Sequence, residues 1–181
     1  MKITLIYILS QIFIILNYVF LVISYQSKNR NKILLLGIAS KVSAGLSYIC
    51  LAAYTGIAMS LIGIFRSLIF MFNEKKNGVS KKITLNDVLI LLVIYALTII
   101  LTIFTYKGFL SLMSVFATSL YTYSIWQKDT KKYKILGIPV SIIWLIYNFY
   151  IKSIFGIILE FILMISAIIG FINEKNTVKK V

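Results

Sequence analysis

The sequence lacks histidine and contains very little cysteine, proline or acidic side chain. Its 181 residues include no His, one Cys, one Pro and five Asp or Glu, against 19 Lys or Arg. The lone Cys50 excludes a disulfide framework, and the absence of His excludes histidine-ligand metal sites and histidine-based acid–base catalysis. We therefore expect neither an enzyme nor a bound cofactor or metal.

Charge of either sign is also scarce, and long apolar runs take its place. Hydrophobic residues make up 60% of the chain and charged residues 13%, with a mean hydropathy of +0.96. A soluble domain is closer to half apolar and a quarter charged. The chain is therefore predicted to be an integral membrane protein whose main partner is the lipid bilayer. The net charge of +14 does not indicate a nucleic-acid partner, because the basic residues lie between apolar runs.

Seven apolar segments are predicted to be transmembrane helices, because lipid offers no hydrogen-bond partner to an open backbone. They cover about residues 3–25, 33–54, 56–73, 85–105, 109–126, 135–151 and 154–172. Crossing a hydrocarbon layer of ~30 Å takes roughly 20 such residues. The first segment is too long for a cleaved signal peptide and is expected to be retained.

The basic residues predict the orientation. One side of a seven-span arrangement collects 14 Lys or Arg, in loops 26–32, 74–84 and 127–134 and in the C-terminal tail. The other side has three, which are Lys2, Lys107 and Lys152. Because Lys and Arg concentrate on the cytoplasmic side, the N-terminus is predicted outside and the C-terminus in the cytoplasm.

A weak internal repeat appears at an offset of 100 residues. The matches are Leu36-Gly37-Ile38 with Leu136-Gly137-Ile138, Gly56-Ile57 with Gly156-Ile157, and Asn73-Glu74-Lys75 with Asn173-Glu174-Lys175. This offset predicts an all-α 3+1+3 bundle of two parallel triple-helix repeats, residues 1–76 and 108–181, with residues 77–107 forming a loop and linker helix. Parallel repeats of this kind are a transporter architecture with a substrate site near mid-membrane. The alternative is an old duplication that only stabilises a helical bundle.

Two segments carry a family resemblance. Trp144-Leu-Ile-Tyr-Asn148-Phe149, followed by Ser153, Gly156 and Glu160, resembles the second half of the YgjV-type bacterial inner-membrane proteins, and Phe65-Arg66-Ser67-Leu68 resembles part of their first half. That family is grouped with the SWEET, semiSWEET and PQ-loop proteins. The resemblance implies a 3+1+3 helix arrangement in the bacterial inner (plasma) membrane, with the N-terminus outside.

The same resemblance implies transport but leaves the substrate open. SWEET members move sugars, related PQ-loop proteins move basic amino acids, and nicotinamide riboside carriers have a similar architecture. This sequence has no Pro-Gln pair, and its only proline, Pro139, precedes Val140. Ala39 occupies the equivalent position of the first half. Pro139 is thus the single hinge candidate.

Three charged residues, Lys41, Arg66 and Glu160, lie deep inside predicted spans rather than at their ends. A central charge costs roughly 2.5–3.5 kcal/mol on insertion scales, so each needs a physical reason. Lys41 and Arg66 have two interpretations: they either snorkel toward the cytoplasmic surface or face inward as cations that bind substrate.

Glu160 is the only carboxylate in the interior of a predicted span, at a depth matching Trp144. Asn148 lies one helical turn from Trp144 on the same face. An aromatic plate, an amide and a carboxylate would line one pocket suited to a sugar or nucleobase, with Glu160 binding substrate or carrying a coupling proton. The alternative is that Glu160 only holds helices together through Asn148, Ser153 or Tyr147.

Other polar side chains, Tyr48, Asn17, Ser43 and Thr118, face either the central cavity or a neighbouring helix. We predict that Tyr48 joins Trp144, Asn148, Glu160, Arg66 and Lys41 in a substrate site. The prediction is a carrier of a small polar solute by alternating access. Its alternatives are a vitamin or nucleoside carrier and a non-transporting membrane partner, sensor or immunity protein. A homo-oligomer is compatible with the sequence, which specifies no coupling ion.

Overall fold

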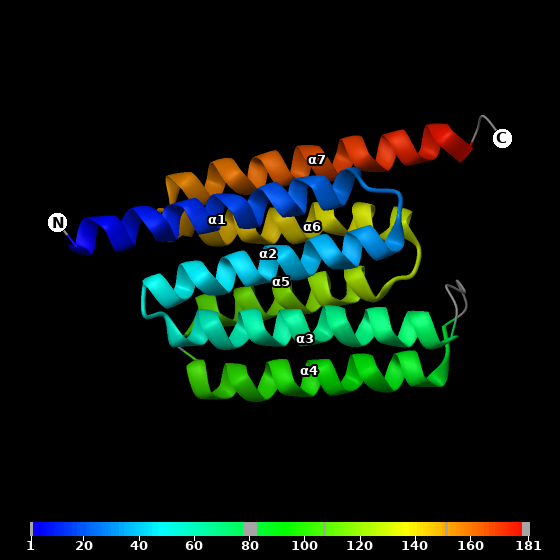
Figure 1. Ribbon diagram of the computed structural model, residues 1–181, viewed down its shortest axis with the longest axis horizontal. Coiled ribbons are helices and arrows are strands. Elements are labelled where there is room, and N and C mark those ends of the chain that lie inside the picture. The colour runs from blue at the N-terminus through cyan, green and yellow to red at the C-terminus, as the bar shows by residue number, and fades with distance from the viewer. Residues whose placement is uncertain (1, 78–82, 107, 151, 179–181) are drawn as a thin grey trace.

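The computed structural model describes residues 2–77, 83–106, 108–150 and 152–178, and these form seven α-helices. The helices are α1 Lys2–Gln26, α2 Arg30–Cys50, α3 Tyr54–Asn77, α4 Leu85–Thr105, α5 Phe109–Trp126, α6 Thr130–Tyr150 and α7 Ile154–Val178. Their axes lie roughly along one common direction, and consecutive helices run antiparallel. With seven helices, α1 therefore begins at one end of the bundle and α7 finishes at the other (Figure 1). The predicted all-α fold is confirmed.

Six of the seven predicted spans are helices long and apolar enough to cross a membrane within the described residues. The exception is α5, an 18-residue helix rich in hydroxyl side chains. Some of those hydroxyls are satisfied locally: Thr122 donates to the Thr118 carbonyl at 2.8 Å and Ser124 to the Tyr121 carbonyl at 2.9 Å. Such bonds allow polar residues to remain in a helix surrounded by apolar side chains.

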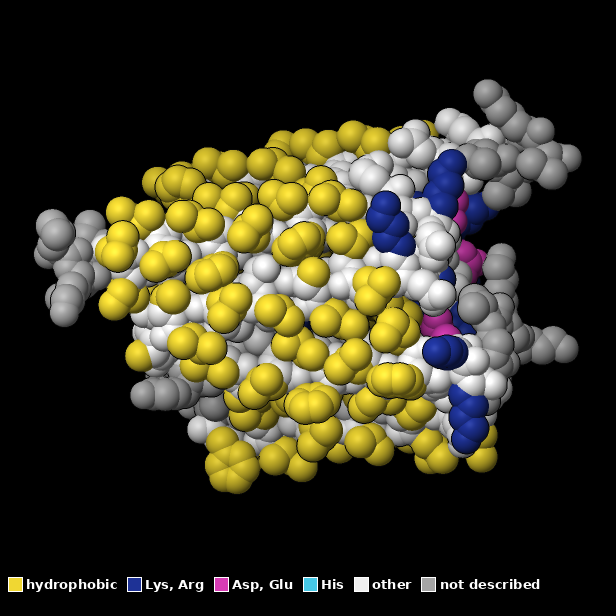
Figure 2. All heavy atoms as spheres, viewed as in Figure 1, with side chains coloured by type: hydrophobic (Ala, Val, Ile, Leu, Met, Phe, Trp, Pro, Cys, Tyr) yellow, Lys and Arg dark blue, Asp and Glu magenta, His cyan; other side chains and the backbone are white. Residues whose placement is uncertain are grey.

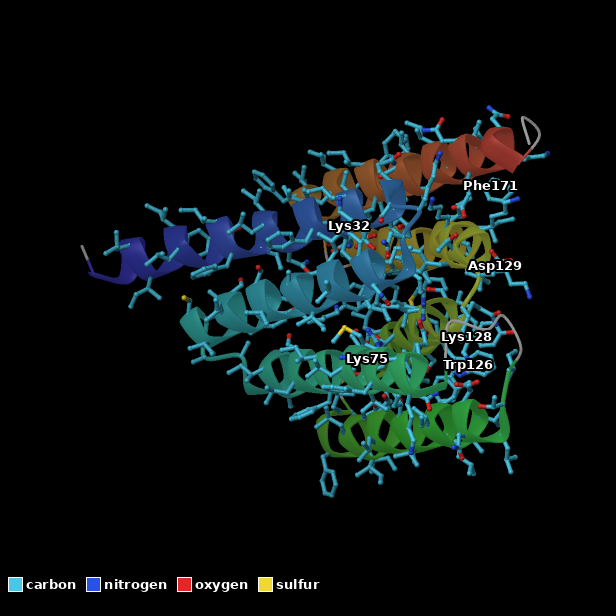
Figure 3. All side chains as sticks on the ribbon, turned by 45° about the vertical axis from the view of Figure 1, so that its right-hand side comes forward. Lys32, Lys75, Trp126, Lys128, Asp129 and Phe171 are labelled. Atoms are coloured by element: carbon cyan, nitrogen blue, oxygen red, sulfur yellow. The ribbon has the colours of Figure 1, made fainter. Side chains whose placement is uncertain are left out.

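The outer surface of the bundle is apolar and its charges gather at one end. Large side chains such as Phe104, Phe116 and Phe149 are exposed on the flanks, as a lipid-facing surface requires (Figure 2). Lys and Arg cluster at the end that holds the α1–α2, α3–α4 and α5–α6 connections, here named the basic end (Figure 2). Lys128 and Asp129 mark this end at the α5–α6 connection (Figure 3).

The helices pack in a closed ring. Each helix contacts the next along the chain, and α7 returns to contact α1. Short connections favour this arrangement because they join antiparallel neighbours. A ring of helices with polar inner faces encloses a centre, which is where the candidate site lies.

Several helix ends differ from the predicted span ends. Helix α3 continues to Asn77, α7 continues to Val178, and α6 begins at Thr130. Hydropathy marks only the part of a helix in hydrocarbon, whereas the backbone hydrogen bonds continue into the interface. Arg30 and Lys134 were counted as loop residues, and this is wrong: both are buried helical residues.

Two of the three connections at the end opposite the basic end, α2–α3 and α6–α7, share a local geometry 100 residues apart. Ala52 and Lys152 both have positive φ, at 51° and 57°. The amides of Ala53 and Ser153 donate to the carbonyls of residues 48 and 148, each at 2.9 Å. Helices α2 and α6 also share their bounds at this offset. The sequence repeat therefore recurs in local backbone structure.

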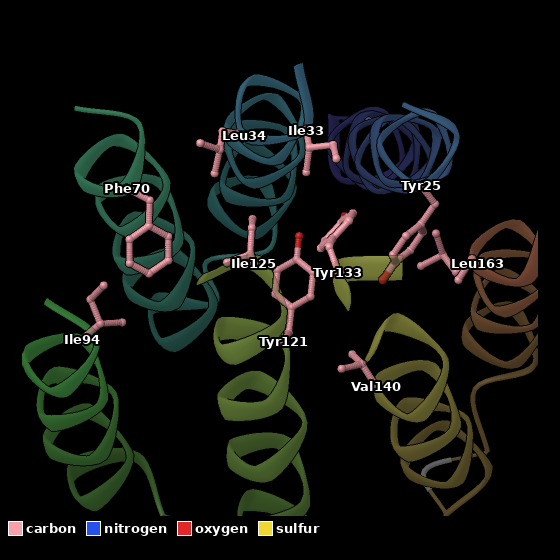
Figure 4. Close-up of a cluster of buried hydrophobic side chains, with 11 residues drawn as sticks. Tyr25, Ile33, Leu34, Phe70, Ile94, Tyr121, Ile125, Tyr133, Val140 and Leu163 are labelled. Carbon is pink, nitrogen blue, oxygen red and sulfur yellow. The ribbon is translucent and has the colours of Figure 1, made fainter. Parts of the chain in front are cut away.

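Buried side chains close the bundle toward the basic end (Figure 4). The rings of Tyr25 and Tyr133 stack with centroids 5.0 Å apart, and Ser24 shares a 2.9 Å hydrogen bond with the Tyr133 hydroxyl. Ile33, Leu34 and Ile125 are fully buried beside them. This cluster joins α1 and α2 to α5 and α6.

Three ion pairs lie at the same end, two of them buried and the third, with Glu174, partly exposed. They join Arg30 to Glu74 at 2.8 Å, Lys128 to Asp87 at 2.7 Å, and Lys134 to Glu174 at 2.5 Å. Asp87 also completes a capping box with Thr84, which explains why α4 begins at Leu85. Removing one partner of a buried pair costs about 3–5 kcal/mol because the other charge is left uncompensated.

Gly137 and Gly37 provide a matched test of the packing at the basic end. A Cβ on Gly137 would lie 2.5 Å from the Tyr25 ring, which is held by its stack on Tyr133, whereas a Cβ on Gly37 would lie 3.4 Å from Ile125. We expect Gly137→Ala to destabilise the protein by about 1–3 kcal/mol through overpacking. Gly37→Ala should be neutral or stabilising. Denaturation in mixed micelles measures both, and equal effects would contradict this packing.

Candidate functional site

A cavity of about 480 Å³ lies at the centre of the bundle, and residues from all seven helices line it. It extends from Tyr48, Gly56 and Asn148, near the opposite end, past Arg66 at mid-bundle to Tyr25, near the basic end. The volume falls within the range of small-molecule sites. A second hollow of about 440 Å³ lies between α4 and α5 and is almost entirely apolar, so it lacks groups that could orient a polar ligand.

All six side chains predicted to bind substrate line the central cavity. They are Lys41, Tyr48, Arg66, Trp144, Asn148 and Glu160. Asn17 and Thr118 line it as well, whereas Ser43 is buried but is not part of its wall. The hinge candidate Pro139 lies inside α6, one residue before the cavity-lining Val140. The structure therefore gathers the predicted polar residues in one place, while their roles stay predictions.

Glu160 is buried in the wall at 6% exposure, and its partners differ from those expected. Tyr18 of α1 donates its hydroxyl to Glu160 Oε1 at 2.9 Å, and Ser141 of α6 supplies a further hydrogen bond. These partners replace the expected Asn148, Ser153 and Tyr147, and they join α7 to α1 and α6, so whether Glu160 also binds substrate stays a prediction. Helix α7 contacts α1 in the ring, so a donor from the far end of the sequence, Tyr18, reaches Glu160.

Trp144 and Asn148 share one face of α6, as predicted. Asn148 donates from Nδ2 to the Trp144 carbonyl at 2.9 Å, and its side chain lies against Gly156 of α7. The Trp144 ring meets the Tyr147 ring edge-on, with centroids 5.3 Å apart. This aromatic pair forms an apolar wall for the part of the cavity nearest the opposite end.

Arg66 is 3% exposed and is only partly satisfied. Its Nη1 donates to Thr122 Oγ1 at 2.7 Å, and its guanidinium lies 5.0 Å from the centre of the Tyr121 ring. Its Nε has no hydrogen-bond partner among the described residues. A buried guanidinium with a free donor is costly without a ligand or water.

Lys41 is directed into the cavity rather than along the helix toward the surface. Its aliphatic stem packs on Gly63, where a Cβ would lie 2.9 Å from Lys41 Cγ. Its Nζ lies 5.7 Å from the centre of the Tyr121 ring. Within the described part of the chain, no hydrogen bond or ion pair reaches this ammonium. The inward-facing arrangement of Lys41 is thus the one the structure has.

The acidic residues show how unusual Glu160 is. Glu74, Asp87 and Glu174 are ion-paired at the basic end, and Asp129 caps α6 by accepting from the Lys131 amide at 3.0 Å. Of the five acids, Glu160 alone lines the cavity. Counted at their formal charges, Lys41, Arg66 and Glu160 give the wall one net positive charge.

Sequence reasoning missed Tyr18, Tyr121 and Ser141, which contact the three charges. Helical spacing places Tyr18 on the same face of α1 as Ile14 and Leu21, but nothing in the sequence joins it to Glu160. The ion pairs left a clearer signal, since Glu74 and Glu174 stand at equivalent positions of the repeat and are two of only five acids.

Residues 8–177 match the profile of Imp-YgjV, described as a bacterial inner membrane protein. The chain belongs to this family. Its apolar helices and the family description together make it a multi-pass protein of the bacterial inner membrane. Comparison with curated proteins and with solved structures gives no match. For this YgjV-family protein, the cavity itself therefore carries the functional argument.

Thiol labelling tests whether water fills the cavity. With Cys50 replaced by Ala, we expect Thr118→Cys to react with a charged, membrane-impermeant thiosulfonate at least about ten times faster than Phe116→Cys. Thr118 lines the cavity, whereas Phe116 lies on the lipid-facing surface two residues away on the same helix. The reaction needs a thiolate, which forms only in contact with water. Equal, slow labelling at both sites would indicate a dry bundle.

Proposed function

We propose that this protein carries a small polar solute across the inner membrane by alternating access. One observation carries the proposal: a cavity of about 480 Å³, enclosed by all seven helices, holds charged and polar side chains at mid-bundle. A protein that only fills the membrane gains nothing from keeping Lys41, Arg66 and Glu160 away from ion-pair partners, because each carries an insertion cost.

The proposed architecture is a pair of parallel triple-helix bundles, α1–α3 and α5–α7, joined by the linker helix α4. The matching turns and helix bounds at an offset of 100 residues support it. So do side-chain contacts: Glu74 binds Arg30, and Glu174 binds Thr130, 44 residues apart in each half. Transporters built in this way place substrate between the halves, where the cavity lies here.

Contacts between the two proposed halves concentrate at the basic end. Arg30 donates to the Ile125 carbonyl at 2.5 Å, Tyr25 stacks on Tyr133, and Gln26 donates to Ser166 Oγ at 2.8 Å. These contacts would form the gate that opens when the halves rock apart. The concentration of basic residues at this end supports placing the gate on the cytoplasmic side, with the cavity reached from outside.

The edge-on pair of Trp144 and Tyr147 favours a second candidate cargo, a nucleoside or aromatic vitamin, because flat rings pack well against aromatic walls. A ligand panel for transport should therefore include sugars, amino acids, nucleosides and organic acids.

Transport in proteoliposomes tests the proposal, with Glu160→Gln compared against Glu174→Gln. Both variants neutralise a carboxylate, but only Glu160 lines the cavity. We expect wild-type protein to accumulate or exchange at least one solute class, Glu160→Gln to lose at least about nine-tenths of that rate, and Glu174→Gln to lose stability but keep its rate per folded molecule. Absence of transport of every class by folded wild type would favour a non-transporting role.

The gate is tested by removing one hydrogen bond from either side. Ser24→Ala and Tyr133→Phe each delete the Ser24–Tyr133 bond while keeping the ring stack. In the Cys50→Ala, Thr118→Cys background, both should increase labelling from the basic side of sealed vesicles several-fold, because loss of a buried hydrogen bond weakens the closed state by about 1 kcal/mol. Unchanged labelling would show that the gate lies elsewhere.

A further inference from the structure

The inner wall of the cavity holds two cations that no acidic side chain neutralises. The three ion pairs among the described residues use other lysine and arginine side chains, and Glu160 lies beyond ion-pair distance of both Lys41 and Arg66. Arg66 is nine-tenths or more buried and retains a free Nε donor. Groups in this state are what a ligand anion would satisfy.

Tyr121 holds the two cations together. The Arg66 guanidinium and the Lys41 ammonium lie 5.0 and 5.7 Å from the centre of its ring. The aromatic face attracts each of them, but it neutralises neither, and the two like charges repel each other. A bound anion would offset that repulsion, because it would attract both cations at once.

The remaining wall limits the ligand's charge and shape. Counted at their formal charges, Lys41, Arg66 and Glu160 give the wall one net positive charge, which one negative charge on the ligand would balance. Glu160 is already engaged by Tyr18 and Ser141, and Trp144 and Tyr147 line the cavity farther from the basic end. A compact ligand would therefore direct its acid group toward Tyr121 and its body toward the aromatic pair.

We infer that the cavity binds a singly charged organic anion, a carboxylate, with Lys41 and Arg66 as its recognition groups. This inference rests on the proposed function where it treats the carboxylate as a transported cargo. The binding of a carboxylate is argued from the residues of the cavity alone. It narrows the cargo from polar solutes in general to monocarboxylates, and it separates them from neutral sugars and from phosphate esters with two charges.

Matched probes in nanodiscs of neutral lipid test the charge rule. Isothermal titration compares benzoate with benzamide and lactate with lactamide, which differ chiefly in the acid group, and phenyl phosphate supplies a second charge. We expect each carboxylate to bind at least about ten times more tightly than its amide and more tightly than phenyl phosphate. Lys41→Met should lower carboxylate affinity at least about ten-fold, whereas Lys32→Met, at an exposed position of the same helix, should not.

Separate readouts distinguish this inference from the proposed function. Carboxylate binding by folded protein without transport in proteoliposomes would support the inference and contradict the carrier. Transport of a neutral solute, with amides and carboxylates binding equally, would overturn the inference and keep the carrier. An absence of carboxylate binding by folded wild type would also overturn it. Arg66→Lys serves as a second variant that retains charge, and it should bind carboxylate more tightly than Lys41→Met does.

Discussion

The absence of water from the bilayer interior is the constraint on which this structure depends. Within it, every backbone group must be paired along a helix, and every charge must find a partner or a polar cavity. The chain follows this rule in two ways. At the basic end, Arg30, Lys128 and Lys134 each have a carboxylate partner. At mid-bundle, Lys41 and Arg66 have an aromatic ring and a cavity instead. That difference separates the structural charges from the proposed functional ones.

The helices could be predicted well from the sequence because, in lipid, the length of each apolar run largely sets the length of the helix. The bounds of α4 and α5 agree with prediction to the residue, since each helix ends close to where its apolar run ends. Agreement was poorer where a helix outruns the membrane, as α3 and α7 do through their Asn-Glu-Lys segments. Hydropathy contains no information about a helix that continues in the interface, where side chains such as Glu74 and Glu174 form ion pairs.

The candidate site was predictable as a set of residues but not as a set of contacts. A charged residue is easily recognised within an apolar segment, which is why Lys41, Arg66 and Glu160 could be predicted as site residues. Their partners lie on other helices: Tyr18 reaches Glu160 across 142 residues, and Thr122 reaches Arg66 across 56. Those distances depend on the ring order of the helices, in which α7 closes onto α1, and no single-sequence pattern encodes that order.

The proposed repeat gives the cavity a direction. At an offset of 100 residues, Lys41 corresponds to Ser141, Arg66 to Ser166 and Glu160 to Ser60. Each charged residue of the wall therefore has a serine at the equivalent sequence position of the other proposed half. The two turns share their backbone geometry, whereas the cavity-lining residues differ at equivalent positions. Both cations belong to the first half and the carboxylate to the second, although a symmetric scaffold would present the same groups twice. A site polarised in this way would favour one orientation of the proposed carboxylate ligand, with its acid group toward Lys41 and Arg66, and the two proposed halves would then contribute unequally to its binding.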